Sequence, residues 1–389
     1  MPNSSFDAIL LVDPRFMGGT ATAFASDVRT LAGAGLRLGV HFVRCQPGYF
    51  QPHETPNKEL LALADLPSVI RFDPARPVRA PIALFHHPLP FAHGIENPVQ
   101  VDTPKAVIIT HQAPFKGDGS LDYDPLTVQR KIRRQFGPSP NWAPISGVSR
   151  RQLKSFAPAL RLTTEDWPNT FNTADWQPQH EKLAGPHLTV GRHGRPHKEK
   201  WGDTGADIAA SLPAGPQTKI RVMGSDPAFF AEMGVLTTNW DVIPFNGEPV
   251  PAFLDRLDVF SYFHGSTWTE TFGRTIAEAM LMGARCILPQ GLKATFGPHA
   301  IYCRPDEVSG VLDDIRDNLP AHRAAVADAR DFCIKTFSTD TVPARLERFL
   351  TDKGTTSRRG DVSAPILTAL RKYAGYHRRR RAAQKGHPA

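Results

Sequence analysis

Short apolar runs alternate with amphipathic segments along most of the chain. In the first half, apolar runs that predict buried strands cover residues 7–13, 36–43, 82–87, 105–111 and 141–146. Segments with helical spacing of apolar residues lie between or after these runs, most clearly at 19–35 and 148–157. Continuously apolar strands joined by helices are typical of a parallel sheet that is covered on both faces. The first half therefore predicts an open α/β domain.

This alternation stops over residues 166–186, which are rich in Pro, Asn, Thr and Trp and show no period. It then resumes with predicted strands at 187–192, 219–224, 241–245, 257–263 and 284–289. Predicted helices lie at 203–212, 249–256, 273–283, 320–335 and 340–351. We therefore expect two Rossmann-like α/β domains, residues 1–168 and 187–336, joined by a connection at 169–186.

The composition is that of an ordinary globular protein. Of 389 residues, 41% are hydrophobic and 22% are charged, which excludes a wholly disordered or fibrous chain. No apolar run reaches the roughly 18 residues of a membrane-spanning helix, and the N-terminus has neither the basic region nor the cleavage site of a signal peptide. The four cysteines lie far apart, which is typical of reduced thiols rather than of a disulfide framework or a zinc site. We expect a cytoplasmic protein.

The net charge of +8 is concentrated at the C-terminus. Residues 353–389 contain ten Lys and Arg against one acidic residue, whereas the rest of the chain has 36 basic and 37 acidic residues. An anionic partner such as a nucleic acid or a membrane is therefore expected to bind only this basic tail.

Ligands of open parallel sheets bind at the carboxyl ends of the strands, so the loops there carry the candidate chemistry. Gly18 and Gly19 open the first helix and allow a ligand close to the backbone, although a tight turn would use them too. Residues 191–200 bring Arg192, Lys198 and Lys200 after a strand. That combination suits a diphosphate, and the alternative is a solvated basic loop.

Two further loops contain acids and histidines. One loop contains Glu270, Phe272 and Gly273 and leads into a predicted helix whose N-terminal amides can face a ligand. Glu278 lies within that helix, where its carboxylate can either bind ribose hydroxyls or have a purely structural role. His111 follows another strand, as do His86 and His87. Metalloprotease, serine-hydrolase and Walker A motifs are absent.

The segment STWTETFGRTIAEAMLMGARCILP (266–289) resembles the E-x7-E segment of retaining, GT-B-fold nucleotide-sugar glycosyltransferases of the family 4 type, with the two acids at Glu270 and Glu278. Other segments resemble this family's motifs in the same order: ILLVDPRFMGGTATAF, VIITHQ, PISGVSRRQL, WPNTFNTADWQP, TVGRHGRPHKEKW and RVMGSDP. The resemblance covers residues 6–350. It implies two Rossmann-like domains facing across a cleft, a nucleotide-sugar donor and a glycan or lipid-linked acceptor.

The resemblance also implies roles. Arg192 and Lys198 would stabilise the leaving diphosphate, with Lys200 as the alternative because His197 takes the family's usual lysine position. Glu278 would hold the ribose, and Glu270 with the amides near Phe272 and Gly273 would hold the donor sugar. Gly18 and Gly19 would approach the phosphates or the acceptor, and His111 would face the sugar. No metal and no cofactor besides the nucleotide sugar are expected.

The resemblance further implies that residues 337–352 form a crossover helix back to the first domain. Two other functions stay open: a nucleotide-sugar epimerase on the same fold, and a nucleic-acid binder acting through the tail. For residues 353–389 we weigh a solvated extension against peripheral contact with an anionic membrane, and expect nucleic acid less.

Overall fold

The computed structural model describes residues 6–51, 53–72 and 74–384. Residues 1–5 lie outside the described residues, and they belong to the N-terminal segment that is expected to lack a signal peptide. Lys385 of the basic tail also lies outside the described residues. The chain forms two compact units. Unit 1 consists of the residues up to Phe171 together with those from Thr339 onward, and unit 2 of Asn172–Ser338.

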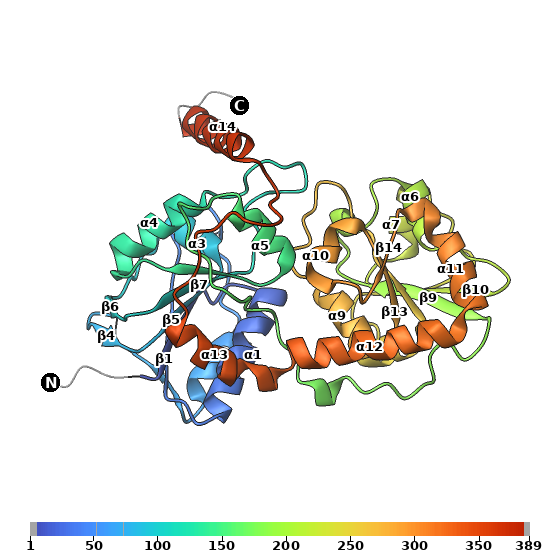
Figure 1. The fold of residues 1–389 in the computed structure, drawn as a ribbon, viewed down its shortest axis with the longest axis horizontal. Coiled ribbons are helices and arrows are strands. Elements are labelled where there is room, and N and C mark those ends of the chain that lie inside the picture. Colours follow the sequence, from blue (N-terminus) through green and yellow to red (C-terminus); the bar gives the residue numbers. More distant parts are fainter. Residues whose placement is uncertain (1–5, 52, 73, 385–389) are drawn as a thin grey trace. The chain divides into compact units, whose positions relative to one another are not determined.

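Unit 1 contains a sheet of six parallel strands (Figure 1) in the order β3 (Val69–Arg71), β2 (Leu38–Phe42), β1 (Ala8–Val12), β5 (Ala83–His86), β7 (Ala106–Thr110) and β8 (Asn141–Pro144). In the register, Leu10 of β1 lies opposite Val40 on one side and Leu84 on the other. Every residue of β1, β2, β5 and β7 is buried, because helices cover both faces. Strands β4 (Val78–Arg79) and β6 (Val101–Asp102) form a separate pair.

The helices of unit 1 come from both ends of the sequence. They are α1 (Gly19–Gly33), α2 (Lys58–Leu61), the 3-10 turn η1 (Ala62–Asp65), α3 (Pro88–His93), α4 (Pro125–Phe136), α5 (Gly147–Lys154), the 3-10 turn η6 (Thr339–Thr341), α13 (Val342–Thr351) and α14 (Ile366–Gln384). Asp124 caps α4 and Ser146 caps α5, each accepting a backbone N–H of the first turn. Helix α13 packs on α1.

Unit 2 repeats the same architecture. Its parallel strands lie in the order β11 (Trp240–Ile243), β10 (Thr218–Met223), β9 (Leu188–His193), β12 (Val259–Ser261), β13 (Arg285–Leu288) and β14 (Ile301–Tyr302). The helices are α6 (Gly205–Ser211), α7 (Pro227–Glu232), α8 (Val250–Asp255), α9 (Arg274–Leu281), α10 (Lys293–Phe296), α11 (Val308–Asp317) and α12 (Leu319–Phe337). The 3-10 turns are η2 (Thr173–Asp175), η3 (Lys198–Lys200), η4 (Gln290–Leu292) and η5 (Pro305–Glu307).

Each sheet reverses its strand order once, between β1 and β5 in unit 1 and between β9 and β12 in unit 2. At such a switch point the loops from neighbouring strands leave in opposite directions and expose a crevice at the carboxyl ends. The α/β prediction with two open parallel sheets is confirmed.

The described part of the basic tail, residues 353–384, is attached to unit 1. Thr355 and Leu162 exchange backbone hydrogen bonds of 2.8 and 2.6 Å, and Arg358 donates to the carbonyl of Ser155 at 2.5 Å. Ala364 is buried, and α14 follows (red in Figure 1). Within the described part of the chain, no helix combines the length and the hydropathy needed to span a bilayer.

Candidate functional site

The main polar cluster of unit 2 lies at its switch point, where β9 and β12 are neighbours. The Lys200 Nζ lies 2.7 Å from Glu270 Oε2 and 4.1 Å from the centre of the Trp268 ring. The hydroxyl of Tyr262 donates to the same carboxylate oxygen at 2.5 Å, and the Gly273 N–H donates to the other oxygen at 3.1 Å. The loop after β9 is thus joined to the loop after β12 through one carboxylate.

Glu270 is held in its ionised form. Burial by itself raises the pKa of this carboxyl, but the ammonium of Lys200 and the hydrogen bonds from Lys200 and Tyr262 outweigh it, and the pKa falls to about 2. A permanent carboxylate beside an ammonium can accept hydrogen bonds from hydroxyl groups, and it keeps Lys200 in place for an anion.

Arg192 lies behind this pair and not in an open site. It is 1% exposed, lies between the rings of Trp201 and Tyr262, and donates at 2.5 Å to the carbonyl oxygens of Phe263 and Lys200. Burial lowers its pKa to about 10. Arg192 is too deeply buried for direct contact with a diphosphate in this arrangement, although its Nε–H has no hydrogen-bond partner among the described residues.

Lys198 is exposed on the outer side of the same loop. It lines a cavity of about 410 Å³ together with His197, Asp203 and Thr267. The Gly265 N–H donates to the Glu199 carbonyl at 3.0 Å beside this cavity. Of the two lysines that the sequence leaves open, Lys200 is therefore the one that contacts Glu270.

Glu278 lies one turn into α9, with 9% of its surface exposed. Its Oε2 is 3.4 Å from His193 Nε2 and its Oε1 is 3.4 Å from the Arg274 guanidinium. Gly273, with φ of 86°, adopts the left-handed conformation that starts α9 at the required angle. The Phe272 side chain packs against Phe337 in the core, so only its backbone can serve a ligand.

Three histidines gather at the switch point of unit 1. His86 Nδ1 lies 3.2 Å from His111 Nε2, and the rings of His87 and His111 stack with centroids 6.1 Å apart. His87 has φ of 72°, a strained value for a non-glycine residue, and its Nδ1 accepts the Leu89 N–H at 3.3 Å to cap α3. His111 is thus the outermost member of a buried imidazole cluster.

A buried acid lies behind these histidines. The indole N–H of Trp167 donates to Asp27 Oδ2 at 2.9 Å, and the same oxygen lies 3.9 Å from His86 Nε2. Burial raises the pKa of Asp27 to about 7, although Trp167 and the charge of Arg345 lower it.

Asp27→Asn is expected to remove a loss of stability that the wild type suffers as the pH rises toward 7. A folded-state pKa raised above the unfolded value contributes stability at low pH that is lost as the pH rises toward 7. The asparagine can still accept the Trp167 N–H and carries no such penalty. The stability advantage of the variant should grow by roughly 3 kcal/mol between pH 5 and pH 8, because the change falls in the two units below the folded pKa of about 7 and one pKa unit is about 1.4 kcal/mol. Urea titrations of both proteins at the two pH values check this, and a constant difference contradicts it.

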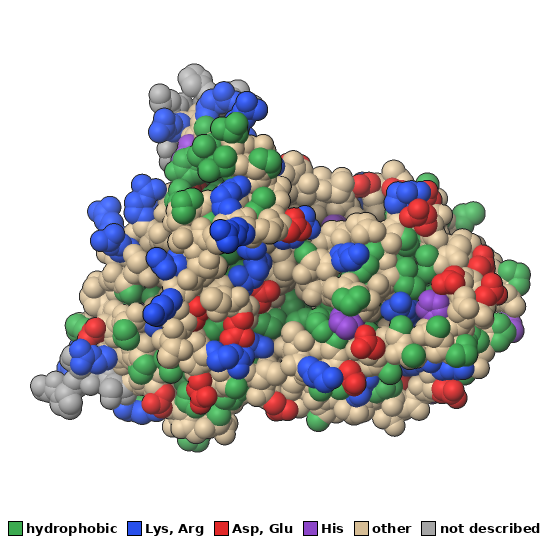
Figure 2. All heavy atoms as spheres, viewed as in Figure 1, with side chains coloured by type: hydrophobic (Ala, Val, Ile, Leu, Met, Phe, Trp, Pro, Cys, Tyr) green, Lys and Arg blue, Asp and Glu red, His purple; other side chains and the backbone are tan. Residues whose placement is uncertain are grey.

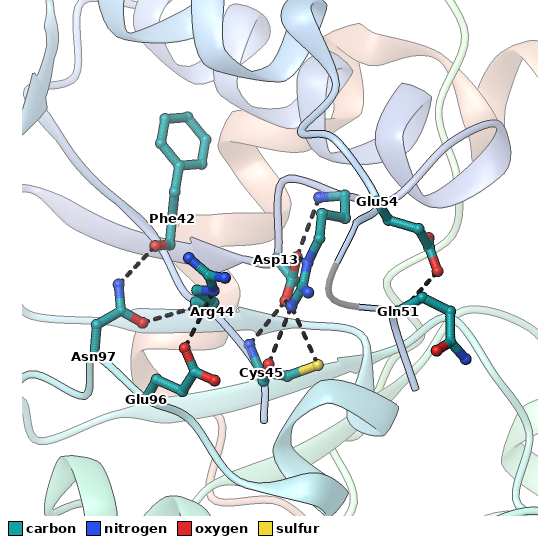
Figure 3. Close-up of polar contacts among 9 residues, drawn as sticks. Asp13, Phe42, Arg44, Cys45, Gln51, Glu54, Glu96 and Asn97 are labelled. Atoms are coloured by element: carbon teal, nitrogen blue, oxygen red, sulfur yellow. Dashed lines mark hydrogen bonds and ion pairs between the residues drawn. The ribbon is translucent and has the colours of Figure 1, made fainter. Parts of the chain in front are cut away.

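The glycine loop of unit 1 is fixed by a buried ion pair (Figure 3). Arg15 binds Asp13 through two hydrogen bonds of 2.9 and 2.7 Å, and the Cys45 N–H donates to Asp13 at 2.9 Å. Figure 3 shows the Asp13 carboxylate beside Cys45, which lies three residues after the end of β2. Gly18, with φ of 65°, then precedes α1, and Gly19 is its first residue. The two glycines are therefore held at the carboxyl end of β1.

Several residues of these clusters received no role from the sequence, although some lie in the candidate loops: Asp13, Arg15, Asp27, Trp167, His193, Tyr262, Trp268 and Arg274. Most are aromatic, or acids and bases satisfied by a partner distant in sequence, so no local motif marks them. His193 carried a positional signal, because it directly follows the predicted strand 187–192, whereas Tyr262 lies inside the predicted strand 257–263. Among the described residues, no group of three or more His, Cys, Asp and Glu side chains could hold a metal ion.

No known protein-family model matches the chain, and no curated protein matches it. Solved structures do resemble it. Anabaena Alr3699/HepE in complex with UDP-glucose is 12% identical, with a TM-score of 0.60 over 89% of this chain and 99% of that one. A glycosyltransferase from Rickettsia africae is 12% identical, with a TM-score of 0.59 over 90% and 98%. WaaG, a glycosyltransferase involved in lipopolysaccharide biosynthesis, is 14% identical, with a TM-score of 0.52 over 88% and 99%.

The chain has the GT-B glycosyltransferase fold. The matches span nearly the whole of each compared protein, so the likeness covers both Rossmann-like units. HepE has also been solved with UDP and glucose.

Proposed function

We propose that this protein is a retaining glycosyltransferase that moves a sugar from a nucleotide diphosphate to a glycan or lipid-linked acceptor without a metal. The observation that carries the proposal is the Lys200–Glu270 ion pair at the switch point of the second sheet. Glu278 lies close by in helix α9. The likeness to HepE, whose structures contain UDP and UDP-glucose, supports a nucleotide-sugar donor.

In this proposal the donor is held by three kinds of contact. Glu278 accepts hydrogen bonds from the ribose hydroxyls, and Glu270 accepts them from the sugar. Lys200 stabilises the diphosphate, with Lys198 at the rim. Arg192 acts through the backbone, because its bonds to the Lys200 and Phe263 carbonyls fix both loops. Gly18 and Gly19 approach the phosphates or the acceptor from unit 1, and His111 faces the sugar.

The reaction needs no side chain that acts as base in this proposal. An acceptor oxygen forms a bond to the anomeric carbon on the face from which the diphosphate oxygen departs, and that departing oxygen takes the acceptor's proton. Anomeric configuration is then retained. The negative charge that develops on the diphosphate is stabilised best by cations already in place, which is the advantage of a lysine held by a carboxylate.

A panel of nucleotide sugars tests the function. A donor that binds the native protein should raise its Tm by mass action, and NMR of the product made from that donor with EDTA present should show a retained anomeric linkage. Activity that EDTA abolishes and Mg²⁺ or Mn²⁺ restores contradicts the metal-free mechanism. Conversion of the sugar without any acceptor would indicate an epimerase instead.

Glu278→Gln is expected to weaken donor binding more than it slows the chemical step. Hydrogen bonds to ribose exist in the ground state and the transition state alike, so their loss raises the KM of the donor. Charge-assisted bonds are worth roughly 1.5–3 kcal/mol each, or about 10–100-fold in affinity. Glu232→Gln, on an exposed position of α7, is the matched control. A donor KM equal to that of the wild type would refute the ribose assignment.

The basic tail supports a second element of the proposal, peripheral contact with an anionic membrane on the cytoplasmic side. One face of α14 docks on unit 1, where His377 lies 3.0 Å from Asp124 and Lys372 lies over the Phe115 ring. Its outer face exposes Ile366, Leu367 and Leu370, which are 50%, 66% and 58% exposed. In Figure 2, hydrophobic (green) and basic (blue) side chains lie together where Figure 1 places α14. Exposed apolar residues beside arginines fit the boundary of an anionic bilayer.

Vesicle flotation checks this surface. At low salt the full chain should float with vesicles of anionic phosphatidylglycerol, and high salt should release it. It should not float with vesicles of neutral phosphatidylcholine. A chain ending at Pro365 should not float. Replacing Ile366, Leu367 and Leu370 with serine should weaken flotation while the charge is unchanged. Equal flotation of the full and shortened chains contradicts a membrane role for α14.

A further inference from the structure

We infer that two aromatic residues, Tyr262 and Trp268, position the ion pair of the candidate site for the reaction. The pair is Lys200 and Glu270, so this inference rests on the proposed function, which assigns the lysine to the diphosphate and the acid to the sugar. Tyr262 directly follows β12, and Trp268 lies in the loop that leads from β12 to α9. In this role neither aromatic residue needs to touch the donor itself.

Three side-chain donors meet at one oxygen of Glu270. Its Oε2 accepts the hydroxyl of Tyr262 at 2.5 Å and the indole N–H of Trp268 at 3.3 Å. The Lys200 ammonium donates to the same oxygen at 2.7 Å. The Lys200 Nζ also lies 4.1 Å from the centre of the Trp268 ring, where the π electrons attract a cation. The ammonium is therefore held from two sides, by the carboxylate and by the indole.

Tyr262 is in turn held by the buried arginine behind the pair. Its side chain is 2% exposed, and the Arg192 guanidinium carbon lies 4.5 Å from the centre of its ring. Burial raises the pKa of Tyr262 well above its usual range, so the hydroxyl keeps the proton that it donates. Arg192 also donates to the Lys200 carbonyl at 2.5 Å. Contacts thus run from Arg192 through the Tyr262 hydroxyl to the ion pair, and they return through the Lys200 backbone.

The turn that carries Trp268 is tied to the loop after β9. The Trp268 N–H donates to the Gly265 carbonyl at 3.1 Å, and the Gly265 N–H donates to the Glu199 carbonyl at 3.0 Å. The Ser266 N–H donates to both carboxylate oxygens of Asp203, at 2.9 and 3.1 Å. Trp268 itself is only half-buried. Backbone hydrogen bonds between two loops therefore place the indole over the lysine.

Stability alone gives little reason to retain this arrangement. The side chains of Lys200 and Glu270 are 21% and 14% exposed. Removing two charges from water costs free energy that their attraction does not always recover, and apolar residues of similar size are often as stable. Donors that converge on a charged pair at the ends of strands are instead typical of a site whose electrostatics are arranged before the substrate binds.

Lysine ammonium NMR tests the positioning without any substrate. In full-length protein labelled with ¹⁵N-lysine, the signal of Lys200 is assigned through Lys200→Ala, and the hydrogen exchange of its ammonium reports how firmly it is held. We expect slower exchange for Lys200 than for the exposed Lys198 in the wild type. Exchange at Lys200 should become faster in both Tyr262→Phe and Trp268→Leu. Unchanged exchange in both variants overturns the inference.

Steady-state kinetics with a donor found by the nucleotide-sugar panel test the role in the reaction. We expect kcat to fall about tenfold in Tyr262→Phe and in Trp268→Leu, with the donor KM changed less than about threefold, because lost orientation matters most in the transition state. Trp268→Phe keeps a ring over Lys200 and should restore most of kcat. Tyr302→Phe is the matched control, since it removes a buried hydroxyl that has no hydrogen-bond partner among the described residues. It should leave kcat unchanged.

Double-mutant cycles separate positioning from a purely structural role. Trp268→Leu should have little further effect on kcat in a Lys200→Ala background, and Tyr262→Phe little in a Glu270→Ala background, because the group to be positioned is gone. Fully additive losses overturn the inference, and so does a normal kcat in both single variants. A wild-type protein that is inert toward every nucleotide sugar refutes the proposed function instead, and the ammonium exchange still decides whether the aromatic residues hold Lys200.

Discussion

Lys200→Ala is expected to lower kcat for sugar transfer by about 10²–10³-fold. Charge builds on the diphosphate as the glycosidic bond breaks, so a cation beside it contributes more in the transition state than in the ground state. Removing one donor to a developing anion has an effect of this size in oxyanion holes. Lys200 is the lysine that Glu270 holds at 2.7 Å, which keeps its ammonium oriented before the substrate arrives. Steady-state kinetics with a saturating donor measure the loss.

Lys198→Ala is the matched comparison, because this lysine is exposed two residues earlier in the same turn. Its charge is screened by solvent, so we expect a loss of less than about tenfold, mainly in the donor KM. A large loss of kcat in Lys198→Ala together with an unchanged kcat in Lys200→Ala would reject the assignment of the diphosphate to Lys200. Arg192→Ala cannot serve this purpose, since it leaves two buried carbonyl oxygens without their donor and destabilises the loop itself.

Much of the fold could be predicted because parallel strands buried on both faces leave a strong local signal. The apolar runs at 7–13 and 105–111 became β1 and β7, and every residue of both strands is buried. Two of the four edge strands, β3 and β14, gave no such signal. Strand β3 has only three residues and β14 only two, and their side chains are partly exposed, so neither shows a continuous apolar run. The helix α4 was also missed, because it is rich in charge.

The candidate site was only partly predictable, for a different reason. Motif spacing identifies the loops that reach the switch points, but it does not show which side chain turns outward. Arg192 near the end of β9 and Lys200 in the following turn are eight residues apart, yet Arg192 lies buried between two aromatic rings and Lys200 contacts Glu270. Asp27 lies in a helix with ordinary apolar spacing, and only the fold brings it to His86.

Phe349→Ala is expected to lower the free energy of unfolding by about 3–5 kcal/mol, the usual effect of deleting a buried phenylalanine. Phe349 of α13 is fully buried, and its ring meets Trp167 edge-on at 5.1 Å between centroids. Trp167 in turn donates to Asp27, so Phe349 supports the carboxylate behind the histidines. Urea unfolding followed by tryptophan fluorescence and circular dichroism measures the change.

Leu350→Ala is the control on the next residue of the same helix, where the side chain is 42% exposed. Its effect should stay within about 0.5 kcal/mol, as for most surface substitutions. Equal losses in the two variants would mean that α13 does not contribute its buried face to unit 1.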